Sequence, residues 1–145
     1  MAACYENAGI RFLYPENWTI TEDEVPSCRL SVSVQSPESG FWSLAVYGGR
    51  VNPRDLVEQV LESMCREYEG VECTRVVERF GDVRPAGYEM CFYCLDFIVN
   101  SRAIAARARG KTLLIMWQAE DREYQQLEPV FRAITSSLFR GEPRG

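Results

Sequence analysis

Apolar and polar residues alternate along the first third of the chain, with the period of two that is typical of half-buried β-strands. In residues 29–35, for example, Leu30, Val32 and Val34 alternate with polar side chains. Four segments of this kind precede residue 50: 10–14, 18–20, 29–35 and 41–47. Each is followed by proline, glycine or a polar turn. We therefore predict four strands in this part of the chain, with an acidic loop over 21–27.

Between residues 56 and 68 the apolar residues recur at helical spacing instead. Asn52 is suited to cap the start of a helix, Pro53 fits its first position, and Gly70 is a natural stop. The sequence thus predicts an amphipathic helix between Asn52 and Gly70, with its apolar side toward the core.

A second helical segment lies near the end of the chain, where residues 121–127 have helical character. The turns that follow have an apolar side made of Val130, Phe131, Ile134 and Leu138. Because proline inside a helix removes a hydrogen bond, we expect a break near Glu128 and a last helix that starts at Pro129. Residues after about 139 are expected to fray.

The most apolar stretch, residues 86–118, predicts three successive strands rich in branched and aromatic residues. These strands are 88–99, 102–109 and 112–118. Asn100-Ser101 and Gly110-Lys111 separate them and are suited to tight hairpin turns. The first and third strands are apolar on both faces, as is typical of strands that are covered on both sides of a sheet.

Together these elements predict an α+β fold. A strand over 72–80 precedes the apolar stretch, so the order is four strands, a helix, four strands and a helix. Short links between strands favour a largely antiparallel sheet of about six to eight strands, packed with two main helices. With 145 residues, the chain 1–145 fits a single domain.

Composition and charge narrow the classes of function. The net charge is −5, and the turn with Arg107, Arg109 and Lys111 is too small a basic patch for nucleic acid, so no nucleic-acid partner is expected. The sequence contains no histidine, which removes the commonest general base and the imidazole metal ligand. We therefore predict no metal and no cofactor.

Six cysteines raise the question of a disulfide, zinc or redox site. Cys91 and Cys94 have C-x-x-C spacing, but both lie within a predicted strand. Residues three apart in a strand project to opposite faces, so these two thiols cannot bind one metal together. The cysteines are therefore interpreted as small buried apolar residues in a reducing compartment.

Membrane signals are also missing from the sequence. No apolar run reaches the roughly 18 residues of a membrane-spanning helix. The start, Met1-Ala2-Ala3-Cys4, is similar to the end of a bacterial lipoprotein signal, but it lacks the preceding apolar segment. We therefore expect a cytoplasmic location and no membrane span.

Three motifs spread along the chain form a recognisable set. The first is F-x-Y-P-x-x-W, from Phe12 to Trp18, and the second is Gly87, which leads into the apolar stretch. The third lies in the last helix, where L-x-P-x-F starts at Leu127 and S-L-F follows at 137–139. This arrangement resembles the PsbP/DcrB-like superfamily over nearly the whole chain, and the resemblance implies that superfamily's α+β fold.

The superfamily contains proteins with different roles. They include a photosystem II extrinsic subunit, a bacterial inner-membrane lipoprotein, a Ran GTPase release factor and cytosolic chaperones of type VI secretion effectors. This chain lacks the transit peptide of the first and the complete lipoprotein signal of the second. The chaperones fit best in size, and resemblance to them implies a homodimer that holds apolar segments of a partner.

No catalytic constellation emerges from the sequence, so we predict a bacterial, non-catalytic protein-binding or adaptor domain with an unknown protein partner. Its contact surface is expected on the sheet face that the helices leave open. Arginine and aromatic residues are favoured at interfaces. The candidate contact residues are Trp42, Tyr47, Tyr93, Arg102, Arg107 and Arg109.

Two alternatives remain open at this point. A cytosolic chaperone that holds an apolar segment of a secretion effector predicts a homodimer and a large apolar patch on the sheet. A small-molecule-binding protein or enzyme would instead use Asp96 with Arg102 across the hairpin, or Cys91 or Cys94 as a nucleophile.

Overall fold

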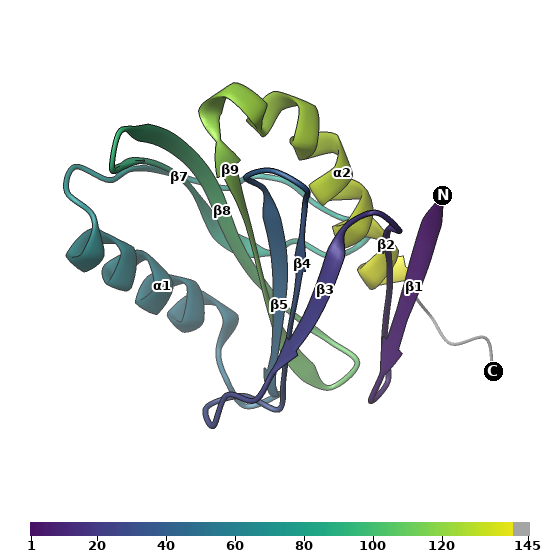
Figure 1. Cartoon of the computed structure of the whole chain (residues 1–145). Helices are drawn as coiled ribbons and strands as arrows, with labels where there is room; N and C mark the ends of the chain where they lie inside the picture. The colour runs from purple at the N-terminus through teal and green to yellow at the C-terminus, as the bar shows by residue number, and fades with distance from the viewer. Residues whose placement is uncertain (141–145) are drawn as a thin grey trace.

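A computed structural model describes residues 1–140 of the chain (Figure 1). The strands are Ala2–Asn7 (β1), Ile10–Pro15 (β2), Thr19–Asp23 (β3), Leu30–Gln35 (β4), Phe41–Gly48 (β5), Glu72–Arg75 (β6), Ala86–Cys94 (β7), Phe97–Ala108 (β8) and Lys111–Glu120 (β9). The helices are Pro53–Glu67 (α1) and Asp121–Arg140 (α2). The end of the chain was expected to fray, but α2 continues to Arg140, and the rest of that tail lies outside the described residues.

Seven of the strands form one antiparallel sheet in the order β3-β4-β5-β9-β8-β7-β6. The other two, β1 and β2, pair as a separate antiparallel ribbon. The strands β7, β8 and β9 follow one another as a meander, and β5 lies beside β9. The predicted α+β class with a largely antiparallel sheet is therefore confirmed.

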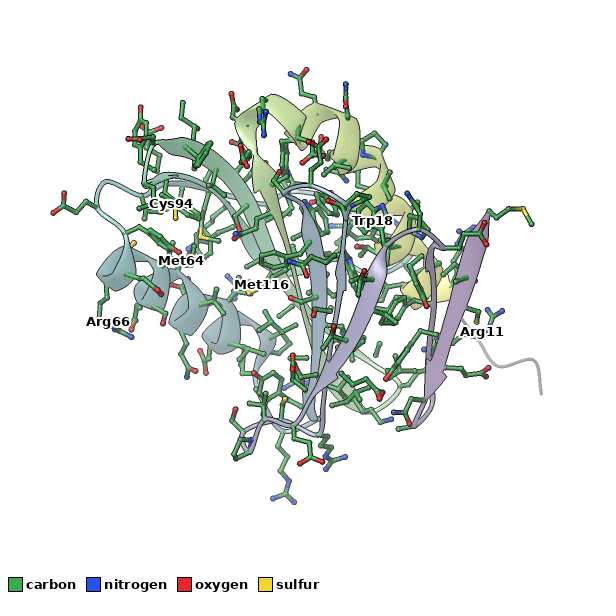
Figure 2. The ribbon with its side chains drawn as sticks, in the orientation of Figure 1. Arg11, Trp18, Met64, Arg66, Cys94 and Met116 are labelled. Carbon is green, nitrogen blue, oxygen red and sulfur yellow. The ribbon has the colours of Figure 1, made fainter. Side chains whose placement is uncertain are left out.

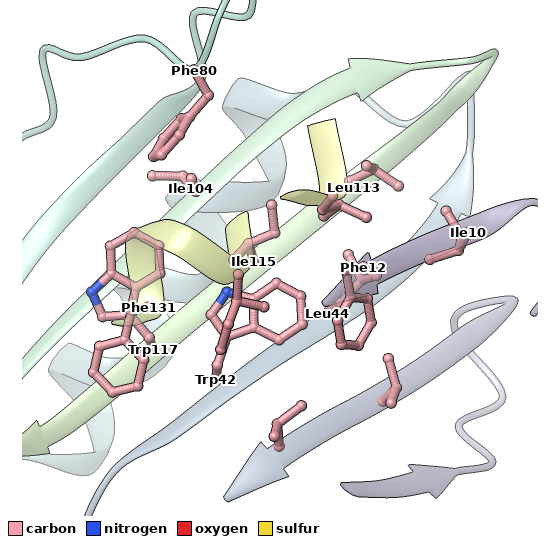
Figure 3. Packing of buried hydrophobic residues seen from close by; sticks show 14 of the residues in the cluster. Ile10, Phe12, Trp42, Leu44, Phe80, Ile104, Leu113, Ile115, Trp117 and Phe131 are labelled. Carbon is pink, nitrogen blue, oxygen red and sulfur yellow. The ribbon is translucent and has the colours of Figure 1, made fainter. Parts of the chain in front are cut away.

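One face of the sheet is covered by α2 and by the β1–β2 ribbon (Figure 1). Figure 3 shows the core on this side, where aromatic rings pack among aliphatic side chains. The ring of Phe12 lies 4.8 Å from that of Trp42, and Phe131 stacks on Trp117 with a centroid distance of 5.9 Å. Burial of such large rings is a major source of stability for a domain of this size.

The opposite face is covered only in part. Helix α1 packs on β7, β8 and β9, where the small side chains of Ala103 and Ala105 let it approach the sheet closely. Met64 of α1 and Met116 of β9 lie between the helix and the sheet, whereas Arg66 points away from it (Figure 2). The part of this face formed by β3 and β4 has no helix over it (Figure 1).

The sequence predicted the start of α1 correctly. The side chain of Asn52 accepts hydrogen bonds from the backbone N–H groups of Arg54, at 2.8 Å, and Asp55, at 3.3 Å. Pro53 follows at the first helical position, where its missing N–H is not needed. The helix ends with Tyr68 as its C-cap, two residues before Gly70, which has φ +65°.

The first turn of the meander was predicted wrongly. The turn is Leu95-Asp96, and Asn100 and Ser101 lie inside β8. The register places Arg102 opposite Glu89 on one neighbouring strand and Trp117 on the other. A turn at Asn100-Ser101 would leave Arg102 beside the turn, without these neighbours. The second turn is Arg109-Gly110, one residue before the predicted position.

Three other predictions also need correction. The strand expected over 72–80 ends at Arg75, and β3 extends into the predicted acidic loop as far as Asp23. The strand β1 was not predicted. Helix α2 continues through Pro129 without the expected break. Both Pro129 and Gln125, whose carbonyl loses its donor, are exposed, so water can satisfy that carbonyl.

Candidate partner-binding surface

Exposed apolar side chains gather at the tip of the β7–β8 hairpin. They are Tyr93 (67% exposed), Leu95 (90%), Phe97 (49%) and Ile98 (39%), and we call these four residues the hairpin patch. Isolated apolar side chains on a surface need no explanation, but a group of them within six residues of one hairpin does.

The pairing of the strands makes the hairpin patch apolar on both faces. Tyr93 lies opposite Ile98 on one face, and Cys94 lies opposite Phe97 on the other, with Leu95 in the turn between them. Directly opposed side chains in an antiparallel pair have Cβ atoms only about 5 Å apart. The tip therefore presents a continuous apolar wedge.

Each helix contacts the β7–β8 hairpin at a residue close to the hairpin patch. Tyr68, which ends α1, stacks on Phe92 with a centroid distance of 4.4 Å. Asp121, which begins α2, accepts a hydrogen bond of 2.7 Å from the side chain of Asn100. Residues 93–98 extend from these two contacts at the upper end of β7 and β8 in Figure 1.

The backbone at the tip is also unusual. Leu95 has φ +57°, in the left-handed region that residues other than glycine adopt at a cost of about 1–3 kcal/mol. A leucine in this position brings no packing to offset that cost, because its side chain is 90% exposed. Folding alone therefore does not account for Leu95.

Acidic residues surround the hairpin patch. They come from the end of α1 and the loop after it, from β6, from the turn, and from the junction of β9 and α2: Glu67, Glu69, Glu72, Asp96, Glu120 and Asp121. The basic residues on the same segments are Arg66, Arg75 and Arg122. Arg75 lies at the far end of β6, opposite Tyr88, and Arg122 is bonded to Glu120 at 3.0 Å. Partial burial raises the pKa of the nearby Cys91 thiol, and the charges of Glu72 and Asp121 raise it further.

A network of charged side chains lies further along β8, between the sheet and α2. At its centre is Arg102, which bonds to Glu78 at 2.5 Å and also to Glu89, and which lies 3.8 Å from Glu128. Its guanidinium carbon is 5.6 Å from the centre of the Trp117 ring, an arrangement that favours a cation.

Arg132 of α2 completes this network through Glu78 and through Glu128, at 3.6 Å. Partial burial by itself would lower the pKa of Arg132, but the Glu78 hydrogen bond and the neighbouring acids raise it overall. The carboxylates of Glu78, Glu89 and Glu128 are thus all occupied by arginine. The network ties the 76–85 segment, β7 and α2 to β8, which is a structural task.

The structure does not assemble the catalytic groups considered from the sequence. Asp96 lies in the turn, and Arg102 lies about 16 Å along the strand from the start of β8, at the usual rise per residue. Cys91 and Cys94 both lie in β7, where the alternation of a strand places them on opposite faces, as predicted. The expected burial of the cysteines was wrong, because Cys4, Cys65 and Cys73 are exposed and the other three are only partly buried. A raised pKa keeps the Cys91 thiol protonated and poorly nucleophilic.

The six candidate contact residues do not form one surface. Trp42 and Arg102 were placed wrongly, since Trp42 is fully buried and Arg102 is only 6% exposed. The indole N–H of Trp42 donates to Thr135 at 2.9 Å, so the ring belongs to the core beneath α2. Tyr47 is half-buried beside the α1 cluster, and its burial raises its pKa. Tyr93 lies in the hairpin patch.

The remaining two candidates lie at the opposite end of β8. Arg107 and Arg109 are exposed, and the Nε atom of Arg107 donates to the carbonyl of Gly49 at 3.1 Å. A surface depression of about 590 Å³ lies beside Arg107 and is also lined by Arg54 and Arg84. These arginines are separated from Tyr93 by most of the length of β8.

The open part of the sheet is polar rather than apolar. On β4 the residues that face away from the α2 core are Ser31, Ser33 and Gln35, and their partners on β5 are Ala45, Ser43 and Phe41. The large apolar residues on this face of the two strands are Phe41 and Tyr47, both on β5. The large apolar sheet surface expected of a chaperone is therefore not found on β4 and β5, and the apolar surface lies at the hairpin tip instead.

Sequence reasoning missed Leu95, Phe97 and Ile98 because it placed them inside a strand covered on both sides. The one available signal was Asp96, a good turn residue and the only charge in the later half of that apolar run. Two other kinds of feature are absent from residues 1–140. No group of three or more potential ligand residues is placed to hold a metal ion, and no helix is long and apolar enough to cross a membrane.

Neither a family model nor a curated protein matches this sequence. Solved structures do match. The solution structure of the cyanobacterial PsbP protein (CyanoP) from Synechocystis sp. PCC 6803 superposes with a TM-score of 0.68 over 94% of this chain and 90% of that chain. The chain has a PsbP-like fold. The sequence identity is 14%, so the likeness concerns the fold alone.

Two more structures share the PsbP-like fold. PA94 from Pseudomonas aeruginosa, a protein of unknown function, has a TM-score of 0.56 and 14% identity, over 99% of this chain and 98% of that one. LpqN, which is involved in cell envelope biogenesis of Mycobacterium tuberculosis, has a TM-score of 0.54 and 12% identity, over 92% and 87%. The fold expected from the sequence motifs is thereby confirmed.

Proposed function

We propose that this protein is a non-catalytic protein-binding or adaptor domain, and that the hairpin patch is its contact surface. The observation that carries the proposal is the exposed, strained Leu95 at the tip of an apolar wedge. Strained residues cluster at functional sites, and a few residues near the centre of an interface supply most of its binding energy.

The chemistry of the other polar groups supports the non-catalytic part of the proposal. A general base needs a carboxylate that is available to a substrate. In the network around Arg102, however, Glu78, Glu89 and Glu128 are held by arginines. A cysteine nucleophile needs a lowered pKa, and that of Cys91 is raised.

The chaperone alternative has less support. A protein that shelters an apolar segment needs a broad apolar surface. The uncovered part of the sheet is rich in hydroxyl groups, and the exposed apolar residues form a narrow, convex tip. A convex tip is suited to enter a partner's pocket rather than to enclose a segment. The homodimer and the cytoplasmic location remain predictions of the sequence.

The proposal can be tested by site-specific crosslinking in the native cell. A photo-crosslinking amino acid is placed at position 95 of the full chain, and in a control chain at position 77, because Val77 is 95% exposed but lies outside the hairpin patch. We expect a covalent adduct with one protein from position 95 only. Equal adducts from the two positions, or none from position 95, would contradict the proposal.

The captured protein is then purified and its affinity is measured. Leu95→Gly removes the apolar anchor and relieves the backbone strain, so it tests binding without harming the fold. We expect binding at least about tenfold weaker for Leu95→Gly, as for the loss of an interface anchor, and unchanged for Val77→Ser. Unchanged binding of Leu95→Gly would show that the hairpin patch is not part of the interface.

A further inference from the structure

We propose, on the basis of the proposed function, that the partner of the hairpin patch is a protein with an apolar pocket bordered by basic side chains. Two properties of the tip lead to this inference. They are its apolar wedge and the acidic residues around it, and each places its own requirement on the partner.

The wedge requires a concave apolar pocket. Apolar side chains lie on both faces of the hairpin and in its turn, because Tyr93 opposes Ile98 while Phe97 lies on the other face. A flat surface would cover only one face of this tip. A pocket that receives Leu95 and both flanking faces would desolvate the whole patch, as an interface anchor requires.

The acidic residues require a basic border around that pocket. Asp96 stands at the tip itself. Glu72 is exposed opposite Cys91 of β7, and the exposed Glu69 directly follows Tyr68, whose ring stacks on Phe92. Asp121 and Glu120 lie at the junction of β9 and α2, next to Asn100 and Val99 of the hairpin. Carboxylates at the border of an interface attract a basic partner and repel an acidic one.

The same charges argue against three other occupants. Nucleic acid and anionic lipid surfaces are negative and would be repelled by this border. A second copy of the hairpin patch would bring its own carboxylates against these. The dominance of acid on this end is local, since the other end of β8 carries Arg107 and Arg109.

The test compares two charge-reversed variants with the same change in net charge. In Glu69→Lys/Glu72→Lys the substitutions lie beside the hairpin patch but leave its turn and its apolar residues intact. In the control, Asp23→Lys/Glu24→Lys, they lie at β3, on the opposite edge of the sheet. Circular dichroism is used to check that both variants are folded.

The readout is the rate of association with the protein captured from position 95, measured at low and at high salt. We expect the wild-type rate to fall as salt rises, and the rate of Glu69→Lys/Glu72→Lys at low salt to be at least about tenfold below that of the control. If the two variants associate at equal rates, or if the wild-type rate does not depend on salt, the prediction of a basic border around the partner's pocket is wrong. Weak binding of Leu95→Gly would then still support the proposed function.

Two further measurements address other occupants. Wild-type protein is mixed with vesicles of phosphatidylcholine containing phosphatidylglycerol, and it is also sedimented alone over a range of concentrations. We expect neither vesicle binding nor self-association through the tip. Vesicle binding that Leu95→Gly abolishes, or a dimer that the same substitution dissociates, would overturn the proposal in favour of a membrane or a second copy.

Discussion

The two turns of the β7–β8–β9 meander solve the same geometric problem with opposite residue types. The β8–β9 turn is Arg109-Gly110, with φ +54° and +75°, and glycine at its second position suits a hairpin turn of this kind. The β7–β8 turn is Leu95-Asp96, with Leu95 at φ +57° and no glycine. Both turns thus begin with a non-glycine residue of positive φ, but only the β8–β9 turn follows it with glycine.

The surroundings of the two turns differ in the same way. The β8–β9 turn is held by the rest of the fold, since Lys111 donates to the carbonyl of Ala8 at 2.9 Å and the backbone of Gly49 lies against Gly110. The side chains of the β7–β8 turn extend into solvent. Packing within the fold therefore accounts for the β8–β9 turn but not for the exposed Leu95 of the β7–β8 turn.

The largest effect on stability is expected between the two turns, at Arg102. The substitution Arg102→Met removes the cation that holds Glu78, Glu89 and Glu128 together, and it leaves a largely buried acid short of a partner. Loss of one member of a buried ion pair costs about 3–5 kcal/mol, and the partial exposure of Glu89 and Glu128 places this case near 3 kcal/mol. Urea unfolding measures it.

Arg102→Lys is the matched control, because it keeps the charge but loses the two-pronged geometry of the guanidinium. It should destabilise the protein less than Arg102→Met does. If both variants unfold at the wild-type urea concentration, the network contributes nothing to stability. The Arg102 network would then hold the middle of β8 no more firmly than the rest of the fold holds the β7–β8 turn.

A smaller loss is expected at Gly49, which packs against the β8–β9 turn. A Cβ atom at position 49 would lie 2.4 Å from the carbonyl oxygen of Gly110, so the backbone of one segment must move. Forced movement of this kind costs about 1–3 kcal/mol. We expect Gly49→Ala to unfold at lower urea, and amide exchange to increase at Gly110 and Lys111 but not at Leu95.

An equal increase of exchange at both turns would contradict this prediction. It would mean that the β8–β9 turn is not held locally by Gly49. The two turns would then report only the global stability of the sheet, and the difference between them would disappear.

The elements with local signals were predicted well from the sequence. The strand β4 has a clear period of two, and α1 has a cap, a first-turn proline and an apolar stripe. By contrast, β1 depends on distant contacts. Tyr5 stacks on Phe12 at 4.9 Å and donates to Glu22 at 2.6 Å, and no local pattern in 2–7 indicates either contact.

The candidate surface was harder to predict because residue type does not determine burial. Trp42 and Arg102 were chosen for their interface-prone side chains, yet both are buried in the fold. Leu95 and Phe97 were assigned to a covered strand, because an apolar run looks the same whether it is buried or exposed. The register of β8 decides the matter, and it depends on pairings between residues far apart in the sequence.

A modest loss of stability is expected for Gly110→Ala at the β8–β9 turn. Gly110 has φ +75°, and a Cβ atom there would meet no atom within 4 Å, so backbone strain is the only penalty. We expect a loss of about 1 kcal/mol in urea unfolding. A loss far above this value would show that the turn lacks the space that the structure gives it.

The smallest effect, and the only one of opposite sign, is expected for Leu95→Gly at the β7–β8 turn. Glycine adopts φ +57° without strain, and the lost side chain was 90% exposed, so little packing is given up. The greater freedom of glycine in the unfolded chain offsets part of the gain, which leaves a net stabilisation of at most about 1 kcal/mol. Thermal unfolding of the two proteins side by side measures it. A substitution that stabilises the fold while it weakens partner binding would show that Leu95 is retained for function, whereas clear destabilisation would show that the exposed leucine supports the hairpin after all.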